Sequence, residues 1–326
     1  MLRFLKDWTL PVAIAVGAFF YFLFASVPAL DPLGDELSPV FDTLLPLTIF
    51  LTLFVTFSKV DFHLMRLRRW HSCILAVQLL LTILLAFAIL FLLPALTGDG
   101  SGKEQKLLLE AVLICIIAPC ASASPVVTAK LGGDLTQMTT FVLLSSLVTS
   151  LLIPAVFPLV EPHAASGAGT QFLSAFLAIL RRLSVVLLLP LLLGAIVRHR
   201  LKPLYRWFLR TPDLGFYCWS VSLAITSGIT VKNIVHSQAG LRLLLLIALL
   251  TLLTSFVQFR IGRGIGRLFG EHVCTGQAMF QKNTGLAIWI AYTYLTPVAS
   301  IGAGCYVLWQ NIINSFELWQ HRRSAA

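Results

Sequence analysis

Apolar runs of membrane length fill almost the whole chain and constrain its fold more than any other feature. A bilayer core about 30 Å thick takes about 20 apolar residues per helix. Only 12% of the 326 residues are charged and 58% are hydrophobic, whereas soluble domains carry about 25% charged residues. The sequence therefore predicts an all-α membrane protein, one membrane unit over residues 1–326, with ten transmembrane helices near 8–30, 38–57, 71–95, 106–130, 134–158, 177–197, 214–233, 239–259, 272–295 and 297–319. The first run lacks a small-residue cleavage site, so we read it as a retained helix, with a cleavable signal peptide as the alternative.

The basic residues indicate how the ten helices are oriented. Alternate connections hold most of the Lys and Arg, including the 58–70, 198–213 and 260–271 segments and both termini. Cytoplasmic loops carry this excess in membrane proteins, so we expect a multi-pass protein of the cytoplasmic (inner) membrane with both termini cytoplasmic. The net charge of +10 is explained in this way, and it does not indicate nucleic-acid binding.

The cysteines do not indicate a metal centre or a disulfide framework. None of the six has CxxC spacing, and all lie in apolar runs: Cys73, Cys115, Cys120, Cys218, Cys274 and Cys305. Buried structural thiols are expected for five of the six. We predict no cofactor and no metal.

Two of the ten runs are poor helices. The fourth contains "APCASASPVVTAK", in which Pro119 and Pro125 enclose small and hydroxyl residues at mid-span. Proline removes a helical hydrogen bond and clashes with the preceding turn. The ninth contains "QKNTG", Gln281 to Gly285, also at mid-span and centred on Lys282. Both runs are expected to be broken, although a simple kink would explain the fourth alone.

The two broken runs occupy matching positions. Each is fourth in a set of five helices, the first set in residues 1–160 and the second in 171–326. An odd number of helices threads the second set in the opposite direction, which predicts two inverted repeats. Paired discontinuities in inverted repeats point to a transporter's binding site. The sequence therefore predicts a secondary transporter and not an enzyme.

At these residues the chain resembles the bile acid:sodium symporter superfamily, which includes arsenite exporters and organic-anion carriers. The likeness rests on "APCASASPVVTAKLGGD", "FQKNTGLAIW" and "VLWQNIINSFE". It implies that spans four and nine cross inside a core of spans three, four, five, eight, nine and ten. It also implies that this core moves against a panel of spans one, two, six and seven. Transport would follow alternating access, usually with two sodium ions.

The chain departs from that pattern where the relatives bind sodium. Their first break supplies Ser-Asn, which reads Ser124-Pro125 here, and their span-nine glutamate is Ala278. The glutamine three residues before the glycine of span nine is Lys282. The relatives also carry hydroxyl residues early in span five, and the matching positions here are Met138 and Val142. Their glutamine in span three is retained as Gln78. The resemblance thus implies a small organic anion as substrate, and the departures predict that transport is independent of sodium.

Lys282 has three competing interpretations. Its stem could extend along the helix to bring the ammonium to water. It could be a permanent ammonium that takes the place of the coupling ion or attracts the substrate. Carbonyl oxygens freed at the breaks would then accept hydrogen bonds from its N–H donors. It could also carry a proton, because burial disfavours the charged form of lysine. Intramembrane ionisable residues are usually functional, which favours the last two interpretations equally.

Further polar residues are assigned by the same resemblance. The residues expected to contact substrate are Asn283, Thr284, Gln310, Asn311, Ser122 and Ser124. Those expected to bind or replace the coupling ion are Lys282, Gln281, Gln78 and Thr128. The helix breaks are assigned to Pro119, Pro125 and Gly285. Capping of a half-helix explains Asn283 and Thr284 equally well. Interhelical hydrogen bonding does the same for Gln310 and Asn311.

Two alternatives remain open. Cys120 in "APC" matches arsenite exporters of the superfamily. Those exporters also use a glutamate in span nine, and this chain lacks it, because the matching position is near Gly285. An intramembrane hydrolase would need a Ser–Lys pair formed by Lys282 with Ser122 or Ser124.

Arg181 and Arg182 are expected at the outer start of span six. Glu110 and Asp42 lie near span ends, away from Lys282.

Overall fold

The structure is a computed structural model that describes residues 9–27, 31–98, 102–161, 172–211, 214–237 and 239–325. Within these residues the regular structure is helical apart from one isolated β-bridge. The elements are α2 (Thr9–Ser26), α3 (Asp31–Ser58), η1 (Phe62–Leu64), α4 (Arg69–Phe87), η2 (Ala88–Leu92), α5 (Leu93–Thr97), α6 (Lys103–Ile117), α7 (Ser124–Lys130), α8 (Leu135–Val160), α9 (Phe172–Leu183), η3 (Ser184–Leu188), α10 (Leu189–Arg200), α11 (Lys202–Arg210), α12 (Leu214–His236), α13 (Leu241–Phe269), α14 (His272–Phe280), α15 (Thr284–Tyr294) and α16 (Pro297–Ala325). The N-terminal basic residues and the 162–171 connection between the expected repeats lie outside the described residues, as does the side chain of Asp42.

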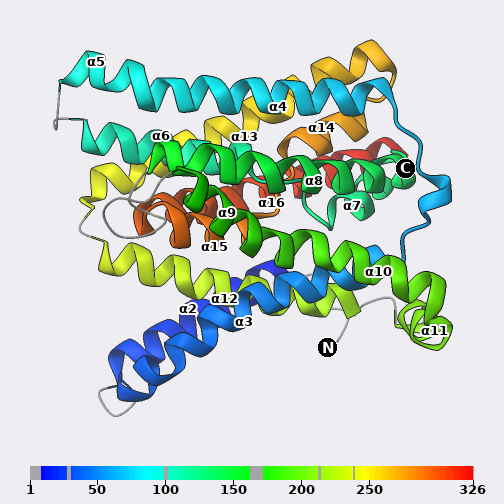
Figure 1. Cartoon of the computed structure of the whole chain (residues 1–326), viewed down its shortest axis with the longest axis horizontal. Coiled ribbons are helices and arrows are strands. Elements are labelled where there is room, and N and C mark those ends of the chain that lie inside the picture. Colours follow the sequence, from blue (N-terminus) through cyan, green and yellow to red (C-terminus); the bar gives the residue numbers. More distant parts are fainter. Residues whose placement is uncertain are drawn as a thin grey trace. The chain divides into compact units, whose positions relative to one another are not determined.

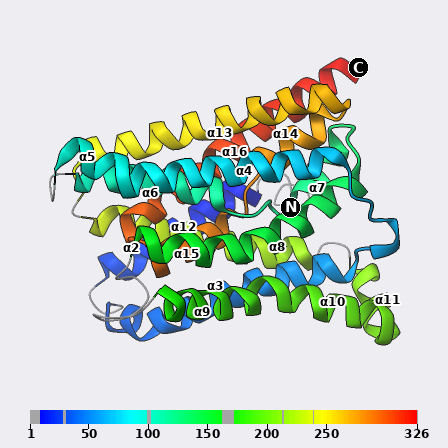
Figure 2. The same ribbon diagram turned by 45° about the horizontal axis from the view of Figure 1, so that its top comes forward.

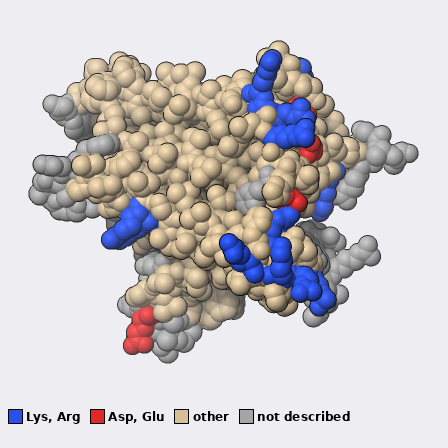
Figure 3. All heavy atoms as spheres, turned by 45° about the vertical axis from the view of Figure 1, so that its right-hand side comes forward, with Lys and Arg blue, Asp and Glu red and all other residues tan. Residues whose placement is uncertain are grey.

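Six of the described helices are long and apolar enough to cross a membrane. They are Pro39–Ser58, Arg69–Thr97, Leu135–Val160, Leu173–Arg200, Tyr217–His236 and Leu241–Phe269. Figure 3 shows that Lys and Arg gather in a few clusters on a face whose remaining surface is mostly uncharged. The expectation of an all-α, multi-pass membrane protein is thereby confirmed. The count of ten spans and the inverted repeats stay predictions.

The chain divides into two compact units. The first comprises Met1–Val60 and Ser184–Gln238, and the second comprises Asp61–Leu183 and Ala239–Ala326. The first unit holds spans one, two and seven and the later part of span six, and the second holds the other spans together with α9, the first part of the sixth-span helix. Apart from α9, the division follows the panel and core that the family resemblance implies.

In the first unit, helices approach closely through small residues. α12 packs against α2 and α3, and all three lie together in Figure 1. A Cβ on Gly17 of α2 would lie 2.2 Å from the carbonyl oxygen of Ala224 in α12. One on Gly194 of α10 would lie 2.9 Å from the backbone nitrogen of Ser58 in α3. Glycine at these positions permits backbone contact, as is common between membrane helices.

In the second unit, the two broken helices pack into a frame of longer helices. α6 contacts α13 and α16, and α14 lies against α13, an arrangement that can be followed in Figure 2. A Cβ on Gly262 of α13 would lie 2.4 Å from the Thr275 carbonyl oxygen of α14. A Cβ on Gly302 of α16 would lie 2.7 Å from Ala111 Cβ of α6. Glycine at these positions permits close approach of the helices in this unit as well.

The helix of the expected sixth span begins earlier than predicted. Its apolar stretch runs from Leu173 to Arg200, so Arg181 and Arg182 lie in the last turn of α9, well inside the helix. Their expected place at the start of span six was therefore wrong. Both side chains are exposed on the surface of the protein. A π-helical segment, η3, follows directly and precedes Pro190, whose ring disturbs the preceding turn.

Candidate site at the crossing of two broken helices

The fourth run is broken where its sequence predicted. α6 ends at Ile117 and α7 begins at Ser124, so the break comprises residues 118–123. Pro119 lies inside the break. Pro125 instead lies in the first turn of α7, a position where proline's missing N–H costs nothing. Pro125 therefore helps to start the second half-helix and is not part of the break.

The ninth run is also broken, over three residues. α14 ends at Phe280 and α15 begins at Thr284. The Asn283 side-chain oxygen accepts a hydrogen bond from Leu286 N at 3.2 Å, so the capping interpretation of Asn283 is confirmed. Gly285 lies in the first turn of α15. Its assignment as a helix break is corrected accordingly.

The two breaks are joined by their backbones. Asn283 N donates to the Pro119 carbonyl oxygen at 2.8 Å, and Ala121 N donates to the Gln281 carbonyl oxygen at 3.0 Å. This pair of bonds forms an antiparallel bridge in which Cys120 stands opposite Lys282. Each break thus supplies partners for backbone groups that the other has freed, which is how such groups are tolerated at membrane depth. The predicted crossing of the two discontinuous helices is present.

Lys282 lies at the centre of this crossing and is 1% exposed. Its ammonium nitrogen donates to the Ile116 carbonyl oxygen of α6 at 3.0 Å. Its backbone N donates to the Gln310 side-chain oxygen of α16 at 3.0 Å. Among the described residues, no carboxylate lies within ion-pair distance of the ammonium. The side chain is enclosed by protein, so the interpretation in which it extends to water is wrong.

The free carbonyls at the ends of α6 and α14 are held by side chains from neighbouring helices. Gln78 of α4 donates to the carbonyl oxygens of Ile117 and Ala118, both at 3.2 Å. Tyr306 of α16 donates to the Phe280 carbonyl oxygen at 2.7 Å. Gln78 therefore braces the first break. The end of α6 also carries the negative pole of the helix dipole toward Lys282.

Three residues of this arrangement were missed from the sequence. Gln258 of α13 donates to the Tyr306 hydroxyl at 3.0 Å and to the Cys115 carbonyl oxygen at 3.3 Å. The Ser145 hydroxyl of α8 accepts from Cys120 N at 3.0 Å. Tyr306 completes the set. The available signal was a polar group in an otherwise apolar run, because a buried polar group needs a partner.

Several buried polar atoms at the crossing have no hydrogen-bond partner within the described residues. They are the Thr128 hydroxyl, the side-chain oxygens of Gln78 and Gln281, and both polar atoms of the Gln277 amide. Buried polar groups are normally paired. Gln277 was not singled out from the sequence, although it lies one turn before Gln281.

The remaining candidate residues are mostly occupied locally. Ser124 donates to the Ala121 carbonyl oxygen at 2.7 Å, and its hydroxyl lies 3.1 Å from the Cys120 sulfur. Asn311 donates to Val307 O within α16. Thr284 is buried at the start of α15, and Ser122 lies in the turn of the first break, partly buried. In this structure no hydrogen bond joins Lys282 to Ser122 or Ser124, as a Ser–Lys pair would require.

Three positions that the sequence resemblance groups with sodium ligands are buried as well. Met138 and Val142 of α8 and Ala278 of α14 are all enclosed. Their side chains offer no oxygen to a cation. Within the described residues, no group of three or more His, Cys, Asp or Glu could hold a metal ion.

The fold and this crossing define a multi-pass membrane protein with two interrupted helices that meet inside one helical unit. A family model described as the sodium bile acid symporter family matches residues 46–258. The chain belongs to this family. The match includes the first break and ends before Lys282 and the second. A search of curated proteins finds no match. Members of the family are transporters, which supports a non-enzymatic role.

Proposed function

We propose that this protein is a secondary active transporter of a small organic anion that works by alternating access without sodium, with Lys282 in place of the coupling ion. The observation that carries this proposal is the buried Lys282 ammonium between two joined helix breaks, bonded to a single carbonyl oxygen. The unit holding the crossing would move against the unit of α2, α3, α10 and α12. We place the protein in the cytoplasmic membrane with both termini in the cytoplasm, from the distribution of basic residues.

The charge at the crossing favours an anion as the substrate. The Lys282 ammonium has three N–H donors, and one of them has a partner among the described residues. No acid compensates its charge there. The N-terminus of α15, which begins at Thr284, adds a positive helix pole at the same place. A carboxylate or sulfonate group would pair with the ammonium and accept from its remaining donors.

The chemistry of the crossing also supports sodium independence. An ammonium and a sodium ion both bind oxygen atoms, and Lys282 occupies the carbonyl end of α6 with its own charge. Sodium would need several oxygen ligands, but Met138, Val142 and Ala278 provide none. A second cation beside a buried ammonium would be repelled. Lys282 would act either as a permanent charge or as a proton carrier.

The test begins with a thermal-shift screen of the purified protein against organic carboxylates and sulfonates, including a bile acid. Uptake of a stabilising anion is then measured in proteoliposomes with sodium, potassium or choline as the only added cation. Equal uptake in the three salts is expected. A clear sodium requirement would contradict the proposal.

Variants separate the two roles of Lys282. Lys282→Met is expected to lose anion accumulation in either case. If Lys282 carries the proton, accumulation driven by a pH gradient is lost while anion exchange without a gradient persists. If it is a permanent charge, both are lost. Lys130→Met, which changes an exposed lysine of the same unit, is the matched control and should behave as wild type.

A further inference from the structure

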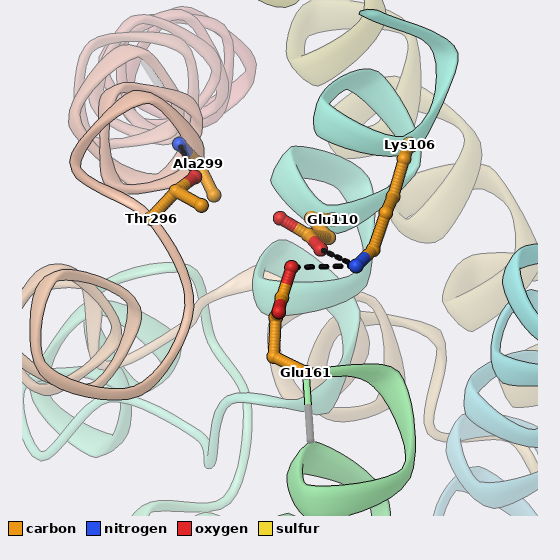
Figure 4. A network of polar contacts seen from close by, with 5 residues as sticks. All are labelled: Lys106, Glu110, Glu161, Thr296 and Ala299. Carbon is orange, nitrogen blue, oxygen red and sulfur yellow. Dashed lines mark hydrogen bonds and ion pairs between the residues drawn. The ribbon is translucent and has the colours of Figure 1, made fainter. Parts of the chain in front are cut away.

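A second cluster of charged groups lies in the same unit, between the first turn and the middle of α6. Glu110 of α6 is 0% exposed, and neither of its carboxylate oxygens has a hydrogen-bond partner among the described residues. The Lys106 ammonium, one turn earlier, lies 3.6 Å from a Glu110 oxygen and 2.5 Å from an oxygen of Glu161. Figure 4 shows Glu110 and Glu161 pointing toward this one ammonium, from α6 and from the end of α8.

The charges of this cluster do not balance. Two carboxylates share one ammonium, and the shorter contact goes to Glu161. Glu110 is the more deeply buried of the two and the less compensated. An ionised carboxylate without hydrogen bonds is strongly disfavoured in a buried place. Two carboxylates that share a site resolve this conflict by holding one proton between them.

Other groups nearby do not supply the missing positive charge. The charged and titratable groups near the cluster come from α6 and from the helices that pack against α6 and α8. Leaving out groups at the far ends of these helices, they are Lys103, Glu104, Cys115, Arg181, Arg182, Arg242, Tyr292, Tyr294 and Cys305. Within the described residues, Lys106 alone forms an ion pair with Glu110 or Glu161. The Thr296 hydroxyl oxygen, also drawn in Figure 4, accepts from Ala299 N at 3.0 Å and so caps α16.

A proton fits this cluster better than a metal ion. The helix beside Glu110 is closely packed, since a Cβ on Gly302 of α16 would lie 2.7 Å from Ala111 Cβ. Two carboxylates and an ammonium do not provide the six to eight oxygens of a calcium site or the octahedral set of a magnesium site. A proton needs neither space nor further ligands.

The cluster also has a route to water. The Lys106 side chain is 32% exposed and that of Glu161 is 19% exposed, whereas Glu110 beneath them is closed off. A proton can therefore enter at Glu161 and pass to Glu110, because both carboxylates contact the same Lys106 ammonium. Glu161 directly follows α8.

We propose that Glu110 and Glu161, with Lys106, form a proton-binding site of this protein. One carboxyl of the pair holds the proton while the other remains an anion paired with Lys106. The proton leaves to water when the pair is separated, with no other bond made or broken. Glu110 and Ile116, whose carbonyl oxygen accepts from Lys282, are six residues apart on α6, or about 9 Å along the axis. Protonation of the pair would thus act on the helix that ends at the crossing, a role in coupling that rests on the proposed transport function.

Infrared spectroscopy of the purified protein tests the site without any substrate. A protonated carboxyl group gives a C=O band that shifts on exchange into D₂O and disappears when the acid ionises. The wild type is expected to show such a band, which decreases as pH is raised. Glu110→Gln should abolish it. Glu161→Gln should abolish it too near neutral pH, because Lys106 then fully compensates Glu110. Glu104→Gln, in the exposed first turn of α6, should leave the band unchanged.

Two results would overturn the proposal. One is a wild-type spectrum whose titrating carboxyl band survives in Glu110→Gln, since the proton then lies elsewhere. The other is a band that is lost in Glu110→Gln but titrates unchanged in Glu161→Gln, since Glu110 would then be a solitary acid. Neither result depends on whether an organic anion is transported. The infrared experiment can therefore refute the proton-binding site while the sodium experiment still supports the proposed transport function, and the reverse.

Discussion

Replacement of Lys282 by methionine is expected to stabilise the protein while it removes function. Methionine has a similar length and no charge, so it fills the same space. A buried ion without an opposite charge costs several kcal/mol of desolvation. The hydrogen bond from the ammonium to Ile116 O offsets about 1.5 to 3 kcal/mol of this, as a bond from a charged donor. The balance predicts a variant that is more stable by about 1 to 3 kcal/mol.

The assay is thermal unfolding in detergent micelles, followed by tryptophan fluorescence for both proteins at the same pH. The midpoint of Lys282→Met should lie above that of the wild type. Lys130→Met, an exposed lysine of the same unit, should change the free energy of unfolding by no more than about 0.5 kcal/mol. An anion that stabilises the wild type should have no effect on Lys282→Met. A lower midpoint for Lys282→Met would refute this reasoning, because the ammonium would then be a structural brace.

Three further substitutions test the packing of the second unit. Tyr306→Phe removes the donor to the Phe280 carbonyl oxygen and should destabilise the protein by about 1 to 3 kcal/mol in the same unfolding assay; an unchanged midpoint would contradict this. Gly302→Ala adds a Cβ 2.7 Å from Ala111 Cβ and should destabilise by about 1 to 3 kcal/mol, whereas Gly264→Ala, with nothing within 4 Å, should be neutral or stabilising. Asn283→Ala removes the cap of α15 and should cost about 1 kcal/mol, which Asn283→Asp should largely restore.

Much of the crossing could be predicted from local sequence. Pro119 marks the first break because proline cannot continue a helix. The second break has no proline, and Lys282 with Asn283 indicates it by placing charge and a capping residue at mid-span. What remained hidden was the bridge between Cys120 and Lys282. That pairing involves backbone atoms of segments about 160 residues apart, and side-chain patterns carry no information on it.

The partners of the free carbonyls were harder to find for a related reason. Gln258, Tyr306 and Ser145 are single polar residues in long apolar runs, and each has many ordinary roles until its neighbours are known. The position of Arg181 was misjudged because a window of about 20 residues does not fix where a longer helix begins. The sequence alone places Glu110 near a span end and gives it no partner. Its significance depends on Glu161 and Lys106, which the fold brings to it.

Chemical rescue of Lys282→Ala tests the central claim most directly. This substitution removes the ammonium and leaves space at the carbonyl end of α6, where Lys282 donates to Ile116 O. If the ammonium takes the place of a coupling ion, anion uptake lost in Lys282→Ala should return when methylammonium is supplied, while wild-type uptake is unaffected by it. Full uptake by Lys282→Ala with choline as the only added cation would contradict the claim.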